Sequence, residues 1–263
     1  MSSNERRMQA GIEAVRKGGA HALDLFRRRG DLVIEKKGRQ DLVSRADRET
    51  ETIIREHIAA LFPEDGFLGE EFGASGAKDR MWIIDPIDGT ANYLAGLDYW
   101  GVLLAYVENG KPTLAFTYDP NRDELWTAEA GKGAYLNGQR IRCASTSRAD
   151  EATMALSFNF KLDPPVYTNM LEAAIRKGMD HRRLGSSALK LGYVADGRFD
   201  ACVSMLTNAW DVVPGLLLVK EAGGCVVDFT KDGHPYDKPR PAAACAPGIR
   251  DVIEEVTGLT LDG

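Results

Sequence analysis

Residues 82–93 read WIIDPIDGTANY. The stretch begins with three bulky apolar residues, as a buried strand does. Two aspartates, Asp85 and Asp88, then stand on either side of a proline and an isoleucine. Proline fixes its own φ and favours an extended residue before it, so we expect both carboxylates on one side of the strand end. Gly89 and Thr90 follow directly and are expected to open a helix, whose free backbone N–H groups would attract an anion.

Acidic residues occur at the ends of other expected elements as well. Glu70 and Glu71 follow a strand-like Phe-Leu-Gly, Asp47 ends the segment DLVSRAD, and Asp211 lies at the start of a strongly apolar helix. The aspartates of the quoted stretch, taken alone, would also fit an ordinary turn. Several carboxylates that converge in one cleft repel one another unless cations lie between them. Such oxygen ligands suit Mg²⁺ or Mn²⁺, and beside an anion site they indicate phosphate chemistry.

The composition narrows the class of protein. The chain has 263 residues, of which 44% are hydrophobic and 27% charged, and its formal net charge is −6. An acidic chain of this kind is not expected to bind nucleic acid generally, and an anionic substrate would need local positive charge or a metal. The four histidines and four cysteines have no zinc-binding spacing. We see no signal peptide and no membrane-spanning stretch, and therefore expect a cytoplasmic protein with reduced thiols.

The periodicity of apolar residues predicts mixed helices and strands with a large antiparallel part in the middle of the chain. Turn sequences at 119–121 and 137–138 predict hairpins there. Helices are expected at 4–29, after Asp47 until residue 63, and at 166–177, 186–195 and 210–222. Strands are expected at 67–68, 81–84, 101–107, 114–118, 153–158, 201–203 and 225–228.

Four sequence segments together resemble the inositol monophosphatase family of magnesium-dependent, lithium-sensitive phosphatases. They are DLVSRAD at 41–47, GEE at 69–71, DPIDGT at 85–90 and WDVVPGLLLVKEAGG at 210–224, in the order and at the spacing of that family. The resemblance implies an α/β (α+β) fold, a layered αβαβα sandwich of the inositol monophosphatase and fructose-1,6-bisphosphatase type. It also implies one domain over residues 1–263, with halves at about 1–145 and 146–263, and a homodimer.

The resemblance implies two or three Mg²⁺ ions per active site, which Mn²⁺ could replace. Glu70, Asp85 and the carbonyl of Ile87 would hold the first ion. Asp85, Asp88 and Asp211 would hold the second, and Glu70 would help to hold a third through water.

The same resemblance assigns the catalytic roles and the phosphate contacts. Thr90, supported by Asp47, would with Glu70 orient the water that attacks phosphorus. The N–H groups of Gly89 and Thr90 would hold phosphate oxygens, and Asp88 would lie beside the substrate.

Further residues are candidates for the substrate pocket. Gly185 and Ser186 match a family segment that lines the pocket, although Ser186 would equally suit a helix N-cap. Lys36 matches a lysine found near the metals in the family, although it would also fit a solvated surface charge. Glu71 is a further candidate, and Asp211 would contact the substrate from the metal side.

One position departs from the inositol-preferring members of the family. Where they commonly carry a glutamate that binds substrate hydroxyls, seven residues before the aspartate of the Trp-Asp pair, this chain has Ser204. A small phosphate monoester, inositol monophosphate first, is the expected substrate. The alternative substrates are histidinol phosphate, fructose 1,6-bisphosphate, NADP and adenosine 3′,5′-bisphosphate. The two nucleotides are less favoured, because Ala91-Asn92-Tyr93 resembles the pattern of the inositol-type members. A regulatory binding protein with secondary phosphatase activity is a further alternative.

Overall fold

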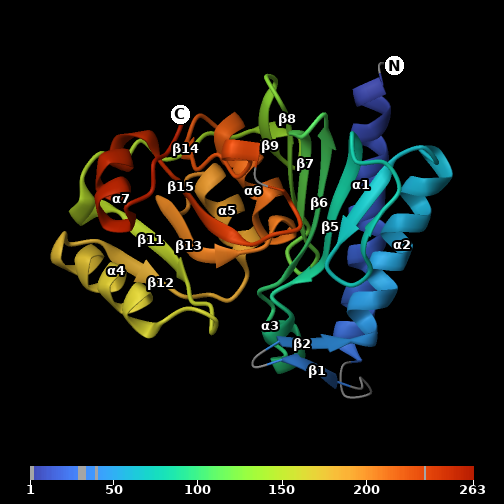
Figure 1. Cartoon of the computed structure of the whole chain (residues 1–263), viewed down its shortest axis with the longest axis horizontal. Coiled ribbons are helices and arrows are strands. Elements are labelled where there is room, and N and C mark those ends of the chain that lie inside the picture. Colours follow the sequence, from blue (N-terminus) through green and yellow to red (C-terminus); the bar gives the residue numbers. More distant parts are fainter. Residues whose placement is uncertain (1–2, 29–33, 39–40, 234) are drawn as a thin grey trace.

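The computed structural model describes residues 3–28, 34–38, 41–233 and 235–263. In these residues, layers of helices and sheets alternate in the order helix, sheet, helix, sheet, helix (Figure 1). The helices are α1 (Ser3–Arg27), α2 (Arg45–Leu61), α3 (Thr90–Ala95), α4 (Pro164–Arg176), α5 (Ser187–Ala195), α6 (Ala209–Glu221) and α7 (Arg250–Thr257). The expected layered sandwich is thus confirmed.

The first sheet contains 8 strands within the described residues, in the order β10-β9-β8-β7-β6-β5-β3-β4. Neighbours pair antiparallel except β3 and β5, which are parallel. Its strands are β3 (Gly66–Gly69), β4 (Gly73–Ser75), β5 (Arg80–Asp88), β6 (Gly101–Glu108), β7 (Lys111–Asp119), β8 (Glu124–Glu129), β9 (Gly133–Leu136) and β10 (Gln139–Arg140). A separate hairpin, β1 (Ile34–Gly38) and β2 (Asp41–Ser44), lies beside α3 (Figure 1).

Helices cover both faces of this first sheet, and strand β5 shows the consequence. Trp82 and Ile84 pack in the core under α1 and α2, whereas Ile83 packs in the core under α5 and α6. A strand buried on both faces needs no polar residue at alternate positions, which explains its unbroken apolar run. Helix α1 lies so close to the sheet at Gly11 that a Cβ there would come 2.3 Å from the ring of Phe116.

The second sheet packs on the other side of α5 and α6. Its described strands follow the order β12-β11-β13-β15-β14, and α4 and α7 cover its outer face. The strands are β11 (Thr153–Ser157), β12 (Asp180–Arg182), β13 (Ala201–Thr207), β14 (Cys225–Val226) and β15 (Arg240–Cys245). Because a sheet lies on each side of α6, this helix is apolar around nearly its whole circumference.

Most expected elements are present, with differences at their ends. Helix α2 begins at Arg45, so Asp47 lies inside its first turn rather than before it. The strand expected at 225–228 is limited to two residues. Neither β15 nor α7 was predicted, since the alanine-rich strand has no polar alternation and the helix is short. The division of the chain into two halves near residue 145 stays a prediction.

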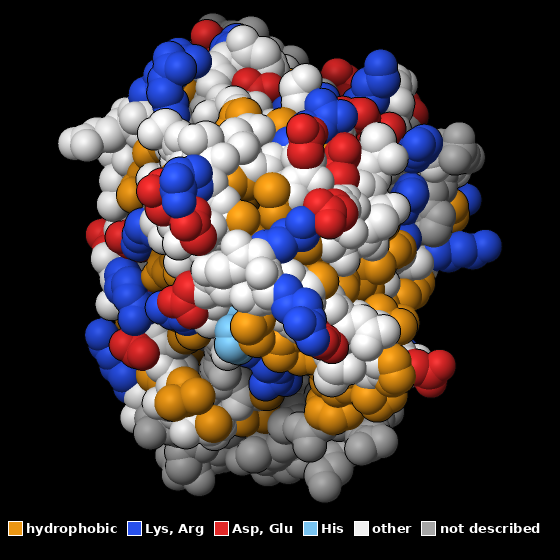
Figure 2. All heavy atoms as spheres, turned by 90° about the vertical axis from the view of Figure 1, so that its left-hand side faces the viewer, with side chains coloured by type: hydrophobic (Ala, Val, Ile, Leu, Met, Phe, Trp, Pro, Cys, Tyr) orange, Lys and Arg blue, Asp and Glu red, His pale blue; other side chains and the backbone are white. Residues whose placement is uncertain are grey.

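Among the described residues on the surface over α4 and α7, Lys and Arg side chains are interspersed with Asp and Glu (Figure 2). None of the described helices combines the length and apolar character that crossing a membrane requires.

Candidate metal centre and active site

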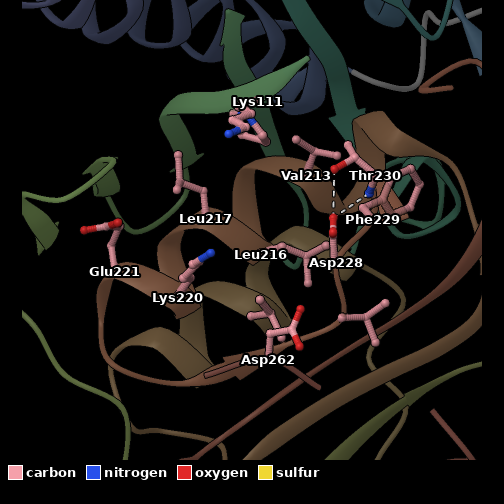
Figure 3. Close-up of a pocket in the computed structure, with 13 residues that line it drawn as sticks. Lys111, Val213, Leu216, Leu217, Lys220, Glu221, Asp228, Phe229, Thr230 and Asp262 are labelled. Carbon is pink, nitrogen blue, oxygen red and sulfur yellow. Dashed lines mark hydrogen bonds between the residues drawn. The ribbon is translucent and has the colours of Figure 1, made fainter. Parts of the chain in front are cut away.

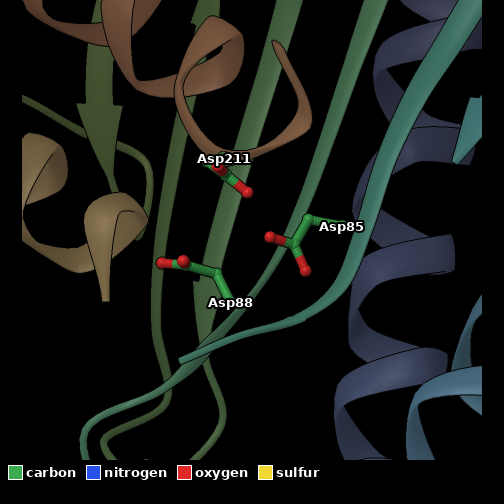
Figure 4. A group of neighbouring side chains, drawn as sticks. All are labelled: Asp85, Asp88 and Asp211. Atoms are coloured by element: carbon green, nitrogen blue, oxygen red, sulfur yellow. The ribbon is translucent and has the colours of Figure 1, made fainter. Parts of the chain in front are cut away.

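Strand β5 delivers two carboxylates to one place through an irregularity. Residues three apart on a regular strand point to opposite faces. Between Asp85 and Asp88 the register with β6 shifts, and the backbone N–H of Ile87 donates to Asp85 Oδ1 at 3.1 Å. Bulges of this kind redirect side chains. Both carboxylates therefore turn toward the gap between β5 and the start of α6 (Figure 4).

Asp211 completes the cluster from the other half of the chain. It lies at the third position of α6, where Thr207 Oγ1 donates to its Oδ2 at 2.8 Å and the backbone N–H of Asn208 donates to the same oxygen at 3.0 Å. One carboxylate oxygen each of Asp85, Asp88 and Asp211 lies within 4.8 Å of the others. Figure 4 shows the three side chains converging.

Asp88 joins the sheet to helix α5. Its Oδ2 accepts hydrogen bonds from the Ser186 hydroxyl and from the backbone N–H of Ala188, the latter at 2.7 Å. Ser186 is also the N-cap of α5, since its hydroxyl accepts from the N–H of Leu189. In both Asp88 and Asp211, Oδ2 is thus the oxygen that accepts these hydrogen bonds. The N-terminus of α5 orients the Asp88 carboxylate, and the N-terminus of α6 orients the Asp211 carboxylate.

The three carboxylates are expensive to ionise together. Burial, followed by the charges of Glu70, Asp88 and Asp211, holds the pKa of Asp85 well above its usual value. Burial likewise raises the pKa of Asp88, and burial together with the Asp88 charge raises the pKa of Asp211 to about 6. A divalent cation would remove this repulsion. Buried oxygen donors without histidine or cysteine fit Mg²⁺ or Mn²⁺.

Glu70 approaches this cluster from a turn that helix α2 fixes. The Glu70 side chain reaches hydrogen-bonding contact with Asp85. The carboxylate of the fully buried Glu51, on α2, accepts the backbone N–H of Glu71 at 2.8 Å and pairs with Arg55 at 2.7 Å. Gly69 is required beside it, because a Cβ there would lie 1.8 Å from Glu51 Oε1.

Glu51 is therefore a positioning residue that the sequence analysis missed. Arg55 extends its hold on the turn by donating to the carbonyl of Gly73 at 2.7 Å. The available signal was an acid on the apolar face of α2, one turn before Ile54 and two turns before Ile58. Glu71, a candidate from the sequence, donates its backbone N–H to Glu51.

Thr90 and Asp47 lie together at the edge of the cluster. The Thr90 hydroxyl lies 3.0 Å from the carbonyl oxygen of Ile87 and 3.3 Å from Asp47 Oδ1, and can donate to either. Asp47 is 1% exposed. Gly89, with φ 96°, precedes Thr90, and a Cβ at that position would lie 3.2 Å from the carbonyl oxygen of Tyr99. The left-handed backbone and this close approach both favour glycine.

A pocket of about 210 Å³ opens beside Asp88 and Asp211. It is smaller than the usual range of about 300–1,000 Å³ for drug-sized ligands, and so suits a small substrate. Four of the predicted substrate residues line it, namely Asp88, Gly185, Ser204 and Asp211. Ser186 is fully buried against Asp88, and its neighbour Ser187 lines the pocket. Lys36 belongs to β1, but its side chain lies outside the described residues.

Two basic residues of this pocket were not predicted from the sequence. Lys190 and Arg183 both line it. Lys190 offered a signal that could have been used, because it interrupts an otherwise apolar helix, SALKLGYVA. Arg183 offered none, since it directly follows three other charged or titratable residues, those of the short strand β12.

A second and larger pocket, about 330 Å³, lies along the flank of α6 (Figure 3). Apolar side chains such as Leu216 and Leu217 form its floor, and Lys111, Lys220, Asp228 and Asp262 surround it. Its acids do not join a cluster like the one at Asp85. Among the described residues, the three aspartates of the smaller site are the group that could hold a metal ion.

The model of the inositol monophosphatase family matches residues 3–257. This chain belongs to the inositol monophosphatase family. It is therefore a phosphoric monoester hydrolase, and its acid cluster can serve the metal dependence of that family.

Individual relatives agree with this assignment. The chain is 40% identical over 236 residues to the Nus factor SuhB of Xylella fastidiosa, covering 89% of this chain and 86% of that protein. It is 38% identical over 237 residues to the fructose-1,6-bisphosphatase/inositol-1-monophosphatase of Thermotoga maritima, covering 88% and 89%. The crystal structure of the extragenic suppressor protein suhB from Bartonella henselae matches with a TM-score of 0.90 and 32% identity, over 96% of this chain and 98% of that one.

Proposed function

We propose that this protein hydrolyses a small phosphate monoester with Mg²⁺, and that inositol monophosphate is the first candidate substrate. The observation that carries the proposal is the convergence of Asp85, Asp88 and Asp211 at one buried point beside a small pocket. Carboxylates in such a place need a cation, and phosphate esters need one to neutralise the charge of the transferred group.

Glu70, Asp85 and the carbonyl of Ile87 would hold one Mg²⁺, and Asp88 and Asp211 with Asp85 would hold another. A third would be held more loosely through water on Glu70. When bound, the ions would neutralise phosphate oxygens and the leaving alkoxide and would acidify a water. Mn²⁺ suits the same ligands.

The residues of the chain itself would position the reactants. Thr90, whose hydroxyl is in reach of Asp47, would orient the attacking water together with Glu70. This water needs a fixed lone pair directed at phosphorus, and a hydroxyl with a buried carboxylate behind it provides that orientation. The N–H groups of Gly89 and Thr90 would donate to phosphate oxygens. Gly185 and Ser204 would contact the alcohol that leaves.

Phosphate release in the presence of Mg²⁺ tests the proposal. A panel of inositol 1-phosphate, histidinol phosphate, fructose 1,6-bisphosphate, NADP and adenosine 3′,5′-bisphosphate would be assayed with MgCl₂ and with EDTA. We expect release of phosphate from at least one of them, dependent on Mg²⁺. If purified, folded protein hydrolyses none of the panel and no p-nitrophenyl phosphate, the proposed activity is refuted.

A second candidate function rests on the names of relatives. Several are Nus factors called SuhB, and a chain this similar to them could also bind a component of the transcription machinery. Affinity purification with the wild-type protein and with Asp85→Asn would separate the two functions. A partner retained equally by both proteins would support binding independent of catalysis.

The family resemblance also leads us to propose a homodimer and inhibition by Li⁺. Light scattering should give about twice the 28.8 kDa mass of the chain. Kinetics with LiCl against KCl at equal ionic strength should show uncompetitive inhibition. Competitive inhibition would refute the proposed action of Li⁺ after hydrolysis.

A further inference from the structure

The pocket beside the metal cluster is lined by charges of both signs. Its two acidic residues, Asp88 and Asp211, belong to the cluster itself. The other charged residues that line it are Lys190 and Arg183, and the remaining lining residues are neutral. Once the acids are engaged with divalent cations, the rest of the pocket is therefore basic. A substrate part that extends past the metals would meet positive charge.

Lys190 is a buried cation that lacks a charged hydrogen-bonding partner. It lies on α5 between Leu189 and Leu191, is 1% exposed, and donates to the hydroxyl of Ser157. No ion pair joins it to a carboxylate anywhere in the described chain. An ammonium group has three donors, and a buried cation is costly unless it is paired. Its placement in a pocket wall is what an anionic ligand would require.

The charge of Lys190 does reach Asp88, whose pKa it acts to lower. However, the hydrogen bonds that Asp88 accepts come from Ser186, Ala188 and Ser187, on the first turn of the same helix. Lys190 is therefore not the group that orients Asp88, and its ammonium keeps donors for a ligand in the pocket.

Arg183 supplies a second positive group at the same pocket. It is exposed, and the described residues provide it with neither a carboxylate partner nor a hydrogen bond. The strands beside the pocket contribute neutral side chains to it. Ser157 of β11 and Ser204 of β13, which lie in register, both line the pocket. A guanidinium and an ammonium at one pocket recognise phosphate or carboxylate groups.

We propose that the preferred substrate is a phosphate monoester whose alcohol part carries a second anionic group, which Lys190 and Arg183 bind. This rests on the proposed phosphatase function and, among its candidate substrates, ranks doubly anionic esters such as fructose 1,6-bisphosphate above inositol monophosphate. The second anion is either another phosphate or a carboxylate, and neither is cleaved while it lies at the basic wall. Lys190 acts as a specificity residue, because it contacts the part of the substrate that does not react.

Matched substrate pairs test this proposal on the wild-type protein with Mg²⁺. Fructose 1,6-bisphosphate against fructose 1-phosphate adds a phosphate, and 3-phosphoglycerate against glycerol 3-phosphate adds a carboxylate. We expect kcat/KM to be about tenfold or more higher for the doubly anionic member of at least one pair, since a charge-assisted hydrogen bond is worth about that factor. The pair with the larger ratio identifies the second group. Equal or lower kcat/KM for both doubly anionic members would overturn the proposal.

Variants of Lys190 locate the effect. Lys190→Met should reduce the ratio within the preferred pair toward one, and Lys190→Arg should restore much of it. Lys220→Met, on an exposed lysine of α6 beside the larger pocket, is the matched control and should keep the wild-type ratio. If Lys190 merely balanced the charge of the carboxylate cluster, Lys190→Met would change the Mg²⁺ dependence equally for both members of a pair and leave their ratio unchanged. That result would also overturn the proposal.

The failure of this proposal can be told from failure of the phosphatase function. No turnover of any pair member, of inositol 1-phosphate and the other substrates of the panel, or of p-nitrophenyl phosphate would refute the function itself. Turnover of inositol 1-phosphate without turnover of either pair would overturn the basic wall and leave the function standing. Turnover of both members without a preference would refute the basic wall and leave the function standing. Arg183→Gln provides a second variant on an exposed side chain, in case Lys190→Met does not fold. It should lower the same ratio.

Discussion

Helix α6 borders two pockets, and the pKa values of two aspartates, one in each pocket, shift in opposite directions. The smaller, at the start of the helix, contains Asp211 in a buried cluster with a pKa raised to about 6. The larger, along its flank, contains Asp228, on which burial acts to raise the pKa. Hydrogen bonds from the N–H and hydroxyl of Thr230, each 2.8 Å, together with the charges of Arg240 and Lys220, outweigh burial and lower that pKa below its usual value.

The larger pocket volume therefore does not mark the proposed functional site. In the larger pocket, Asp228 and Glu221 each have their own donors, since Glu221 accepts the N–H groups of Gly131 and Gly133. The smaller pocket leaves three carboxylates facing one another. A folded chain tolerates that arrangement when a cation is to be bound, because the repulsion is then replaced by coordination.

The largest expected effect comes from Asp85→Asn. We expect kcat to fall by about three orders of magnitude, since the change removes a carboxylate proposed to contact two metal ions. Asp228→Asn is the matched control from the larger pocket and should retain activity. Phosphate release at saturating Mg²⁺ measures both. Comparable losses in the two variants would break the distinction between the pockets.

The second prediction concerns pH and stability without metal. Asp211 titrates at about 6 in the folded chain and near 3.8 when unfolded, so the folded state binds more protons between these values. Stability without metal should therefore fall as pH rises from about 4 to 6, by on the order of 3 kcal/mol from this residue. Mg²⁺ should restore it at pH 7.5.

Urea unfolding in EDTA at pH 4 and pH 7.5 would measure this loss, with wild type compared with Asp211→Asn. The variant should gain stability relative to wild type as the pH rises, and Mg²⁺ should stabilise it less. A constant difference between the two proteins across this range would contradict the assigned cause.

The third prediction tests the turn that carries Glu70. Glu51→Gln should lower kcat by about 10- to 100-fold, as loss of a supporting residue behind a metal ligand commonly does. It should also raise the Mg²⁺ concentration for half-maximal activity. Glu56→Gln, on an exposed position of the same helix, is the control and should behave as wild type. An unchanged Mg²⁺ dependence in Glu51→Gln would show that the turn holds Glu70 in place without the Glu51 carboxylate.

The smallest effect is expected from Ser186→Ala. Removing this N-cap should cost about 1 kcal/mol of stability, because the hydroxyl serves the Leu189 N–H and Asp88 together. Thermal unfolding would measure it, with Ser145→Ala at an exposed position as control. Equal melting temperatures of Ser186→Ala and the control would show that the cap contributes nothing.

Much of this architecture was predictable from the sequence, for physical reasons that differ between residues. The run before Asp85 predicted a buried strand, and the family segments implied the layered sandwich now confirmed. The convergence of Asp211 with β5 could not follow from spacing, because it depends on α6 packing between two sheets. Lys190 and Glu51 were visible as charges within apolar helical faces, but only the tertiary structure shows what each one contacts.

The most direct test of the central claim is a Mg²⁺ titration of phosphate release, using the best substrate of the panel, for wild type and Asp85→Asn. The account predicts saturable activation of the wild type from a baseline near zero in EDTA, and no comparable activation of the variant at any Mg²⁺ concentration. Wild-type activity that persists in EDTA, or an Asp85→Asn variant that reaches the wild-type rate at high Mg²⁺, would contradict it.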